Sequence, residues 1–275
     1  MAAISRQSNM RPTPKWQASP FLKASVALHV GAVVTALLWP HAMGIAIAAV
    51  IANHLALAAA GLWPRSTLLG SNVLRLPNAR AEVALTIDDG PDPDITPQVL
   101  DILKAHGIQA TFFCIAAKVQ RYPELAQRMV AAGHHIENHS MVHRHNFSVL
   151  GLNNIKKELA GAQHVIEEVT GRRPLYFRAP AGLRNLFLDP VLHQLGLQLV
   201  SWTRRGFDTR VGDAQKILDR LLDDLKAGDI LLLHDANAAR GSNGRAVILD
   251  VLPELIARVR KENLQFVKVE DGMRP

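Results

Sequence analysis

Residues 82–91 read Glu-Val-Ala-Leu-Thr-Ile-Asp-Asp-Gly-Pro, an apolar run that ends in two acidic residues and a Gly-Pro turn. The aliphatic and β-branched composition of Val83–Ile87 is typical of a buried strand. Because side chains alternate in direction along a strand, the adjacent carboxylates of Asp88 and Asp89 are expected to point different ways. One carboxylate could then bind a metal while the other acts as a base, although the same residue types also occur in turns that have no function.

Short apolar runs of the same kind recur along the chain and alternate with helical patterns. Helices are predicted over Ile155–Val169, Ala214–Lys226 and Ala246–Arg260. Asp213 is expected to cap the second of these, and Thr96 to be the N-cap of an earlier helix. Alternating strands and helices predict an α/β fold with a parallel sheet, and seven strands suggest a distorted (β/α)7 barrel with its chemistry at the carboxyl strand ends. After Val83–Ile87, the predicted strands are Thr111–Ile115, His135–Asn138, Leu175–Arg178, Gln198–Thr203, Ile230–His234 and Gln265–Val269.

A pair of histidines, His139 and His143, follows the third predicted strand. Four residues apart on one helical turn, their rings would face the same side. Two neutral imidazoles and one carboxylate form the three-ligand set of a catalytic zinc site, which leaves a position open for water. The neighbouring His134, His135 and His145 are expected to be structural or to support the ligands.

Three more polar segments follow predicted strands, as barrel chemistry requires. They are residues 177–182, Phe-Arg-Ala-Pro-Ala-Gly, residues 201–208, Ser-Trp-Thr-Arg-Arg-Gly-Phe-Asp, and residues 230–235, Ile-Leu-Leu-Leu-His-Asp. In the last of these, His234 ends a fully apolar strand, which would place its ring in the barrel mouth.

The order and spacing of the five segments resemble the polysaccharide deacetylase family, the NodB-homology domain of carbohydrate esterase family four. The resemblance covers about residues 82–270. The first motif of the family has an aromatic residue where this chain has Ile87, and the third has one where this chain has Ala181. The fourth motif is the poorest match, with Trp202 and Asp208 as its candidates. The second and fifth motifs are intact.

The resemblance implies a barrel that holds one divalent metal and hydrolyses the N-acetyl group of an amino sugar in a polysaccharide or oligosaccharide. A deformylase or deacetylase of a lipid-linked amino sugar at the membrane is the alternative, and a carbohydrate-binding barrel without catalysis ranks low because every expected ligand, base and acid is present. Zinc is the expected metal, although Co²⁺, Mn²⁺ or Ni²⁺ could occupy such a site. The implied metal ligands are Asp89, His139 and His143; the implied base is Asp88 and the acid His234; Arg178 would hold Asp88, with Asp208 adjacent to it.

The N-terminal part of the chain has a different composition from the rest. A basic tail, residues 1–23, precedes residues 24–64, which contain no Asp, Glu, Lys or Arg. That stretch is too long for one crossing of roughly 20 helical residues and suits a hairpin of two transmembrane helices, Phe21–Trp39 and Met43–Leu62, interrupted at Pro40. A signal peptide is the competing interpretation, but its apolar region should be shorter. Residues 65–81 are predicted to be a linker, and residues 82–275 the NodB-homology domain.

Charge bears on location and partners. Lysines and arginines flank the apolar stretch on both sides, which favours a multi-pass protein of the inner membrane, held through residues 21–62, with both ends in the cytoplasm. A polymeric glycan as substrate would instead require an outward-facing domain. The formal charge is +7, but aromatic residues are 5% of the chain and no basic stripe is present, so nucleic-acid binding is not expected. The single cysteine, Cys114, is expected to be a buried apolar residue.

Overall fold

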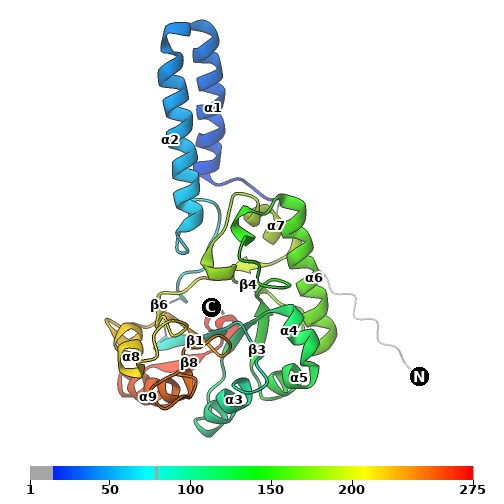
Figure 1. Ribbon diagram of the computed structural model, residues 1–275, viewed down its shortest axis with the longest axis vertical. Coiled ribbons are helices and arrows are strands. Elements are labelled where there is room, and N and C mark those ends of the chain that lie inside the picture. Colours follow the sequence, from blue (N-terminus) through cyan, green and yellow to red (C-terminus); the bar gives the residue numbers. More distant parts are fainter. Residues whose placement is uncertain (1–14, 78–79, 275) are drawn as a thin grey trace, which may run out of the picture.

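The computed structural model describes residues 15–77 and 80–274 and contains a curled parallel sheet wrapped by helices (Figure 1). The sheet has eight strands in the order β5-β4-β3-β2-β1-β7-β6, with β8 paired to β1. All their pairings are parallel. The strands are β1 Glu82–Asp88, β2 Thr111–Cys114, β3 His135–Asn138, β4 Tyr176–Phe177, β5 Gln198–Leu199, β6 Arg204–Arg205, β7 Ile230–His234 and β8 Gln265–Val267.

All seven predicted strands are present, and the distorted barrel is confirmed. The additional strand β6 has two residues and lies inside the fourth motif. It was not predicted because both of its residues are polar and form no apolar run. It pairs with β7 through Arg204↔Leu231 and Arg205↔Leu232. The chain therefore passes directly from β5, at one end of the strand order, to β6 at the other.

Helices surround the sheet and follow the expected alternation (Figure 1). The side chain of Asp213 accepts a hydrogen bond from the backbone N–H of Lys216, as predicted. The prediction for Thr96 was wrong: Thr96 is already helical, and its hydroxyl donates instead to Asp235. The helices of this part are α3 Thr96–Ala105, α4 Ala116–Arg121, α5 Pro123–Ala131, α6 Leu152–Thr170, α7 Leu188–Leu195, α8 Ala214–Leu222, α9 Ile248–Lys261 and α10 Val269–Gly272, with short 3₁₀ turns at Phe147–Val149 and Pro180–Gly182.

The alternation of β1 sorts its side chains between two environments. Val83, Leu85 and Ile87 belong to the buried cluster that the sheet forms with the surrounding helices. Ala84 belongs to a second cluster inside the barrel. Asp88, in step with Ala84, therefore faces the barrel interior. Ile87 packs in the helix layer, so its departure from the aromatic residue of the family does not alter the cavity.

Two apolar helices precede the barrel, α1 Pro20–Leu38 and α2 Met43–Leu62, joined by a 3₁₀ turn that begins at Pro40. They rise side by side from the barrel (Figure 1). Both are long and apolar enough to cross a membrane, and only 6% and 22% of their most hydropathic windows are buried. Low burial distinguishes them from core helices, so they suit a membrane anchor or a signal sequence. Arg6 and Arg11 of the basic tail lie outside the described residues.

The segment that follows α2 packs against the barrel. The Gly61 carbonyl accepts a hydrogen bond from the Arg184 N–H at 3.0 Å, and the Pro64 carbonyl accepts one from the Ser201 hydroxyl at 2.7 Å. Further along, Val73 forms a parallel bridge with Val200, in the stretch between β5 and β6. The end of the hairpin and the residues after it therefore cover the seam of the open barrel.

Candidate active site

The five motif segments meet at one cavity at the carboxyl ends of the strands. Its volume is about 300 Å³, at the lower end of the range for ligand sites. This position is where (β/α) barrels place their chemistry, because the loops after the strands converge there. The lining residues are Asp88, Asp89, His139, His143, His145, Ala179, Ala181, Gly182, Trp202, Arg205, Thr209, Arg210, Leu232, His234 and Asn237.

Asp89, His139 and His143 come together as the sequence predicted. Asp89 Oδ1 lies 3.3 Å from His139 Nε2 and 3.5 Å from His143 Nε2. One ligand atom from each residue lies within 4.8 Å of the others. Ligands about 2.1 Å from a tetrahedral zinc ion would lie about 3.4 Å apart, so the observed spacing suits a divalent cation.

The surrounding contacts prepare these atoms for a cation. His139 Nδ1 lies 2.8 Å from the Arg178 carbonyl, which makes Nδ1 the donor and leaves the Nε2 lone pair facing Asp89. Asp89 Oδ1 is buried and has no hydrogen-bond partner among the described residues. Burial acts to raise the pKa of Asp89, but the close approach and charge of His139 outweigh it, so the pKa is strongly lowered. The carboxylate therefore stays ionised. Burial lowers the pKa of His143, which favours the neutral, ligating imidazole.

Asp88 is held inside the barrel by Arg178. The guanidinium Nη1 donates to Asp88 Oδ1 at 2.7 Å and to the Thr86 hydroxyl at 2.8 Å. Arg178 is only 1% exposed, and its charge lies 4.1 Å from the centroid of the Phe113 ring. Because this ion pair is buried and hydrogen-bonded on several sides, Asp88 has one fixed orientation. The second carboxylate oxygen lies 3.9 Å from His139 Nε2, beside the candidate metal site.

His234 contacts Asp208, the residue that the resemblance implied near Asp88 and Arg178. Asp208 Oδ1 lies 2.9 Å from His234 Nδ1, and Oδ2 accepts the His234 backbone N–H at 2.7 Å. Burial acts to lower the pKa of His234, but the hydrogen bond and charge of Asp208 outweigh it, so the pKa is raised. The imidazole is therefore oriented with Nε2 free and is more readily protonated than an ordinary histidine.

The loop that carries the two histidines is not the helical turn that the sequence predicted. Ser140 and His143 have positive φ values of 66° and 52°, and the rings reach Asp89 from an irregular loop. Asp89 and Ala181, which also line or adjoin the cavity, have φ values of 76° and 53°. A positive φ is unfavourable for a residue other than glycine, and it persists where the surrounding structure fixes the backbone, as it often does at functional sites.

Several groups that no sequence motif indicated support the ligands. The Asn237 side-chain amide donates to Asp89 Oδ2 at 3.2 Å, and Lys118 Nζ donates to the Asp89 carbonyl at 2.9 Å. Burial raises the pKa of Asp235, which accepts from Thr96, to about 7. A Cβ on Gly90 would collide with the Asp235 carboxylate, so the turn after Asp89 requires glycine. The position of Asn237, three residues after a strand-end histidine, was the signal available in the sequence.

The remaining predicted polar groups lie outside the cavity or at its edge. His134 and His135 are structural, as expected: His134 Nδ1 accepts the Ala110 N–H at 3.1 Å, and His135 lies 3.3 Å from Glu270. His145, by contrast, lines the cavity. Cys114 is fully buried, and burial raises the pKa of its thiol, in agreement with an inert apolar role.

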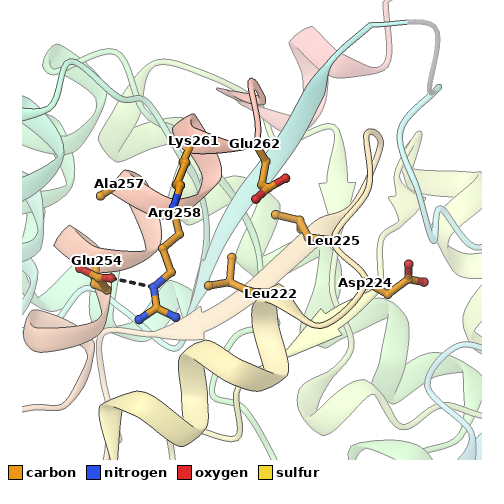
Figure 2. A pocket seen from close by; sticks show the side chains of 8 residues that line it. All are labelled: Leu222, Asp224, Leu225, Glu254, Ala257, Arg258, Lys261 and Glu262. Carbon is orange, nitrogen blue, oxygen red and sulfur yellow. Dashed lines mark hydrogen bonds and ion pairs between the residues drawn. The ribbon is translucent and has the colours of Figure 1, made fainter.

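A larger hollow of about 680 Å³ lies between α8 and α9 and does not have these features (Figure 2). Its lining combines aliphatic side chains with charged groups on the surface, and Glu254 and Arg258 form an ion pair of 2.6 Å within it. No set of metal-ligating side chains is found there among the described residues. The strand-end cavity is therefore the candidate active site, and the fold and its chemistry define a barrel hydrolase.

Comparison with known proteins identifies the family. The model of the polysaccharide deacetylase family matches residues 76–200. A peptidoglycan-N-acetylglucosamine deacetylase of Bacillus cereus is 33% identical over 201 residues, which are 72% of this chain and 91% of that protein. A chitooligosaccharide deacetylase of Azorhizobium caulinodans is 32% identical over 58% of this chain and 77% of its own length.

A solved structure of a peptidoglycan N-acetylglucosamine deacetylase superimposes with a TM-score of 0.67 at 26% identity, and the match covers 73% of this chain and 91% of that one. The chain belongs to the polysaccharide deacetylase family. It is accordingly a hydrolase of the N-acetyl amide bond of amino sugars.

Proposed function

We propose that the protein is a metal-dependent carbohydrate deacetylase whose metal, zinc by preference, is bound by Asp89, His139 and His143. The observation that carries this proposal is the approach of two imidazole nitrogens, His139 Nε2 at 3.3 Å and His143 Nε2 at 3.5 Å, to the buried Oδ1 of Asp89, which has no hydrogen-bond partner in the described part of the chain. When bound, such a metal polarises the amide carbonyl and acidifies a water molecule. Every other step uses side chains of this chain.

Asp88 is the proposed general base. It lies beside the histidine ligands, and Arg178 fixes its carboxylate with the second oxygen toward the cavity. This oxygen can accept the proton of the attacking water while the new carbon–oxygen bond forms.

His234 is the proposed general acid. An amine leaves only after its nitrogen is protonated, because a free amide anion is too basic to be expelled. Asp208 stabilises the protonated imidazole through its 2.9 Å contact with Nδ1 and leaves Nε2–H to face the cavity. As the carbon–nitrogen bond breaks, the Nε2 proton passes to the leaving amine, which gives acetate and a free amino sugar.

The direct test combines metal analysis with acetate release from N-acetylated chitooligosaccharides and peptidoglycan fragments. Asp88→Asn, His139→Ala and His234→Ala are expected to lose activity, and only the His139 variant should also lose metal. Circular dichroism would verify that each variant is folded. The proposal fails if folded His139→Ala releases acetate at the wild-type rate in the presence of a chelator.

We further propose that α1 and α2 anchor the enzyme in the inner membrane as a two-helix hairpin. The side of the catalytic domain follows from the flanking lysines and arginines, which favour the cytoplasm. An alkaline phosphatase fusion after Pro275 reports the side directly: activity would place the domain in the periplasm and overturn the cytoplasmic assignment. A protein that is cleaved within residues 20–62 would overturn the anchor.

A lipid-linked amino sugar, deacetylated or deformylated at the same site, is the second candidate substrate. It is favoured by the contact between the hairpin end and the cavity wall. A Cβ on Gly182, which lines the cavity, would lie 2.6 Å from the Cβ of Pro64, two residues after α2 ends. In an anchored enzyme the cavity would therefore lie close to the membrane surface. Acetate and formate release from lipid-linked amino sugars in detergent would test this candidate.

A further inference from the structure

Two consecutive arginines of β6 have opposite environments. Arg204 forms an ion pair with Asp229, with Nε 3.2 Å from Oδ2, and also contacts Asp224. Because side chains alternate along a strand, Arg205 points the other way and lines the candidate active site. Arg204 is thus paired, whereas Arg205 faces the substrate cavity.

Aromatic rings lie against the guanidinium of Arg205 and do not occupy its hydrogen-bond donors. Its guanidinium carbon lies 5.3 Å from the centroid of Trp202 and 5.0 Å from that of Phe207. A guanidinium held against aromatic rings by cation–π attraction keeps its N–H groups available for a carboxylate or phosphate. The Arg205 Nε is buried and has no acceptor among the described residues. A cation that has no ion-pair partner in the described part of the chain is unusual at such a cavity, because buried donors are normally paired.

The charge balance of the cavity leaves this cation uncompensated. Arg210, which is exposed, lines the same cavity. Each acid nearby has another place in the site: Asp88 pairs with Arg178, Asp89 belongs to the candidate metal site, and Asp208 contacts His234. The wall formed by Arg205 and Arg210 therefore has a positive charge that a neutral sugar would not use.

We propose that Arg205, assisted by Arg210, is a specificity determinant that binds an anionic group of the amino sugar substrate. This inference rests on the proposed function, since it assumes that the acetamide lies at Asp89, His139 and His143. A cavity of about 300 Å³ has room for little more than one sugar residue, so the anionic group belongs to the deacetylated sugar or is attached directly to it. A carboxylate ether on the ring and a phosphate at the anomeric carbon both have this chemistry.

The proposal accounts for the fourth motif, which matched the family least. A chitooligosaccharide is neutral, so an anion subsite would favour an anionic amino sugar over that class of substrate. Arg205 is offered as a binding residue and has no role in proton transfer.

The test measures binding and turnover on the full-length chain, loaded with zinc, in detergent. The probes are N-acetylglucosamine, N-acetylglucosamine 1-phosphate and N-acetylmuramic acid, titrated by calorimetry. Acetate release is measured in parallel from neutral chitotetraose and from fragments that contain the anionic sugars. The variants are Arg205→Gln and Arg205→Lys, with Arg121→Gln as a control that removes one exposed positive charge from α4, outside the cavity.

At least one anionic probe is expected to bind roughly 10- to 100-fold more tightly than N-acetylglucosamine, as a charge-assisted contact provides. Arg205→Gln should abolish this preference, Arg205→Lys should retain part of it, and Arg121→Gln should keep it whole. A preference for only the phosphate or only the carboxylate identifies the source of the anion. The variants keep the metal ligands, so any direct contact between anion and metal is common to all.

Equal binding of neutral and anionic probes, or an anionic preference that persists in Arg205→Gln, would overturn the proposal. The two hypotheses fail separately. Acetate release without anionic preference removes the anion subsite and leaves the deacetylase. An Arg205-dependent preference without acetate release from any substrate removes the deacetylase and leaves the subsite.

Discussion

Replacing Asp208 by Asn would test the general acid without touching a metal ligand. Asp208 is fully buried, and its carboxylate contacts His234 twice, at the backbone N–H and at the ring Nδ1 of the histidine. The backbone N–H needs an acceptor, so the new amide would turn its oxygen there and present its NH₂ group to Nδ1. Two donors would then oppose each other whenever the imidazole is protonated, and the pKa of His234 should fall.

The size of the shift follows from the interaction that is lost. A hydrogen bond to a charged group contributes about 1.5–3 kcal/mol, and 1.36 kcal/mol corresponds to one pKa unit. The pKa of His234 should therefore fall, and this loss corresponds to a decrease of about 10- to 100-fold in the stability of the protonated imidazole relative to the neutral one. A general acid works while protonated, so activity is lost as pH rises through this pKa. The basic limb of the pH profile of kcat should therefore move to lower pH. At pH values above the basic limbs of both enzymes, kcat of the variant should be about 10- to 100-fold lower than that of the wild type, and at lower pH the difference should be smaller.

The assay is acetate release from a saturating chitooligosaccharide across the pH range. Asp213→Asn is a matched control, because it makes the same change at an exposed N-cap, where Asn serves equally well. A uniform loss at every pH, with the basic limb in its original place, would refute the assignment of His234 as the acid oriented by Asp208.

Three further outcomes are expected. His139→Ala should reduce the metal-to-protein ratio to near zero by mass spectrometry, whereas His145→Ala, which lines the same cavity, should retain the metal; retention in both would refute the ligand set. Gly182→Ala should lower the free energy of unfolding by about 1–3 kcal/mol more than Gly171→Ala does, measured by denaturant unfolding. Both glycines have positive φ, but only a Cβ at Gly182 would collide, at 2.6 Å from Pro64 and 2.7 Å from Trp202. Equal losses in the two variants would contradict tight packing around Gly182. Burial lowers the pKa of His134 from 6.5 to about 4, so up to about 3 kcal/mol of stability should be present above pH 6.5 and lost as pH falls toward 4. His134→Asn should flatten this pH dependence of the free energy of unfolding. An unchanged dependence in the variant would contradict the role of His134.

The barrel was predictable because its central strands β1 and β7 are continuous apolar runs, and the shorter runs alternate with helical patterns. His135–Asn138 and Ile230–His234 were predicted at the bounds the structure has. Strand β6 was missed because it has two polar residues, and its pairing comes from the position of β7 rather than from local preference. Thr96 was misassigned for a related reason: its hydroxyl hydrogen-bonds to Asp235, far away in the sequence, and local cap preference contains no information about that partner.

The candidate site was predictable where residues follow strands directly. Asp88, Asp89 and His234 end strands or follow them, so their meeting at one edge follows from parallel pairing alone. The contact of Asp208 with His234 was not predictable in the same way, because the loop after β6 turns through a residue with positive φ, Phe207, before it returns to the cavity. Spacing along the chain does not determine the path of such a loop.

The hairpin is attached to the barrel at both of its ends. Before α1, the Trp16 indole N–H donates to Asp189 at 2.7 Å, and after α2 the Gly61 carbonyl accepts from Arg184. Two attachment points restrain swinging in a way that a single flexible tether would not. For an enzyme anchored in a bilayer, the cavity would then stay at one distance from the lipid surface. Acetamide groups within that layer would be reached repeatedly as lipids diffuse past, and groups farther out would be left intact.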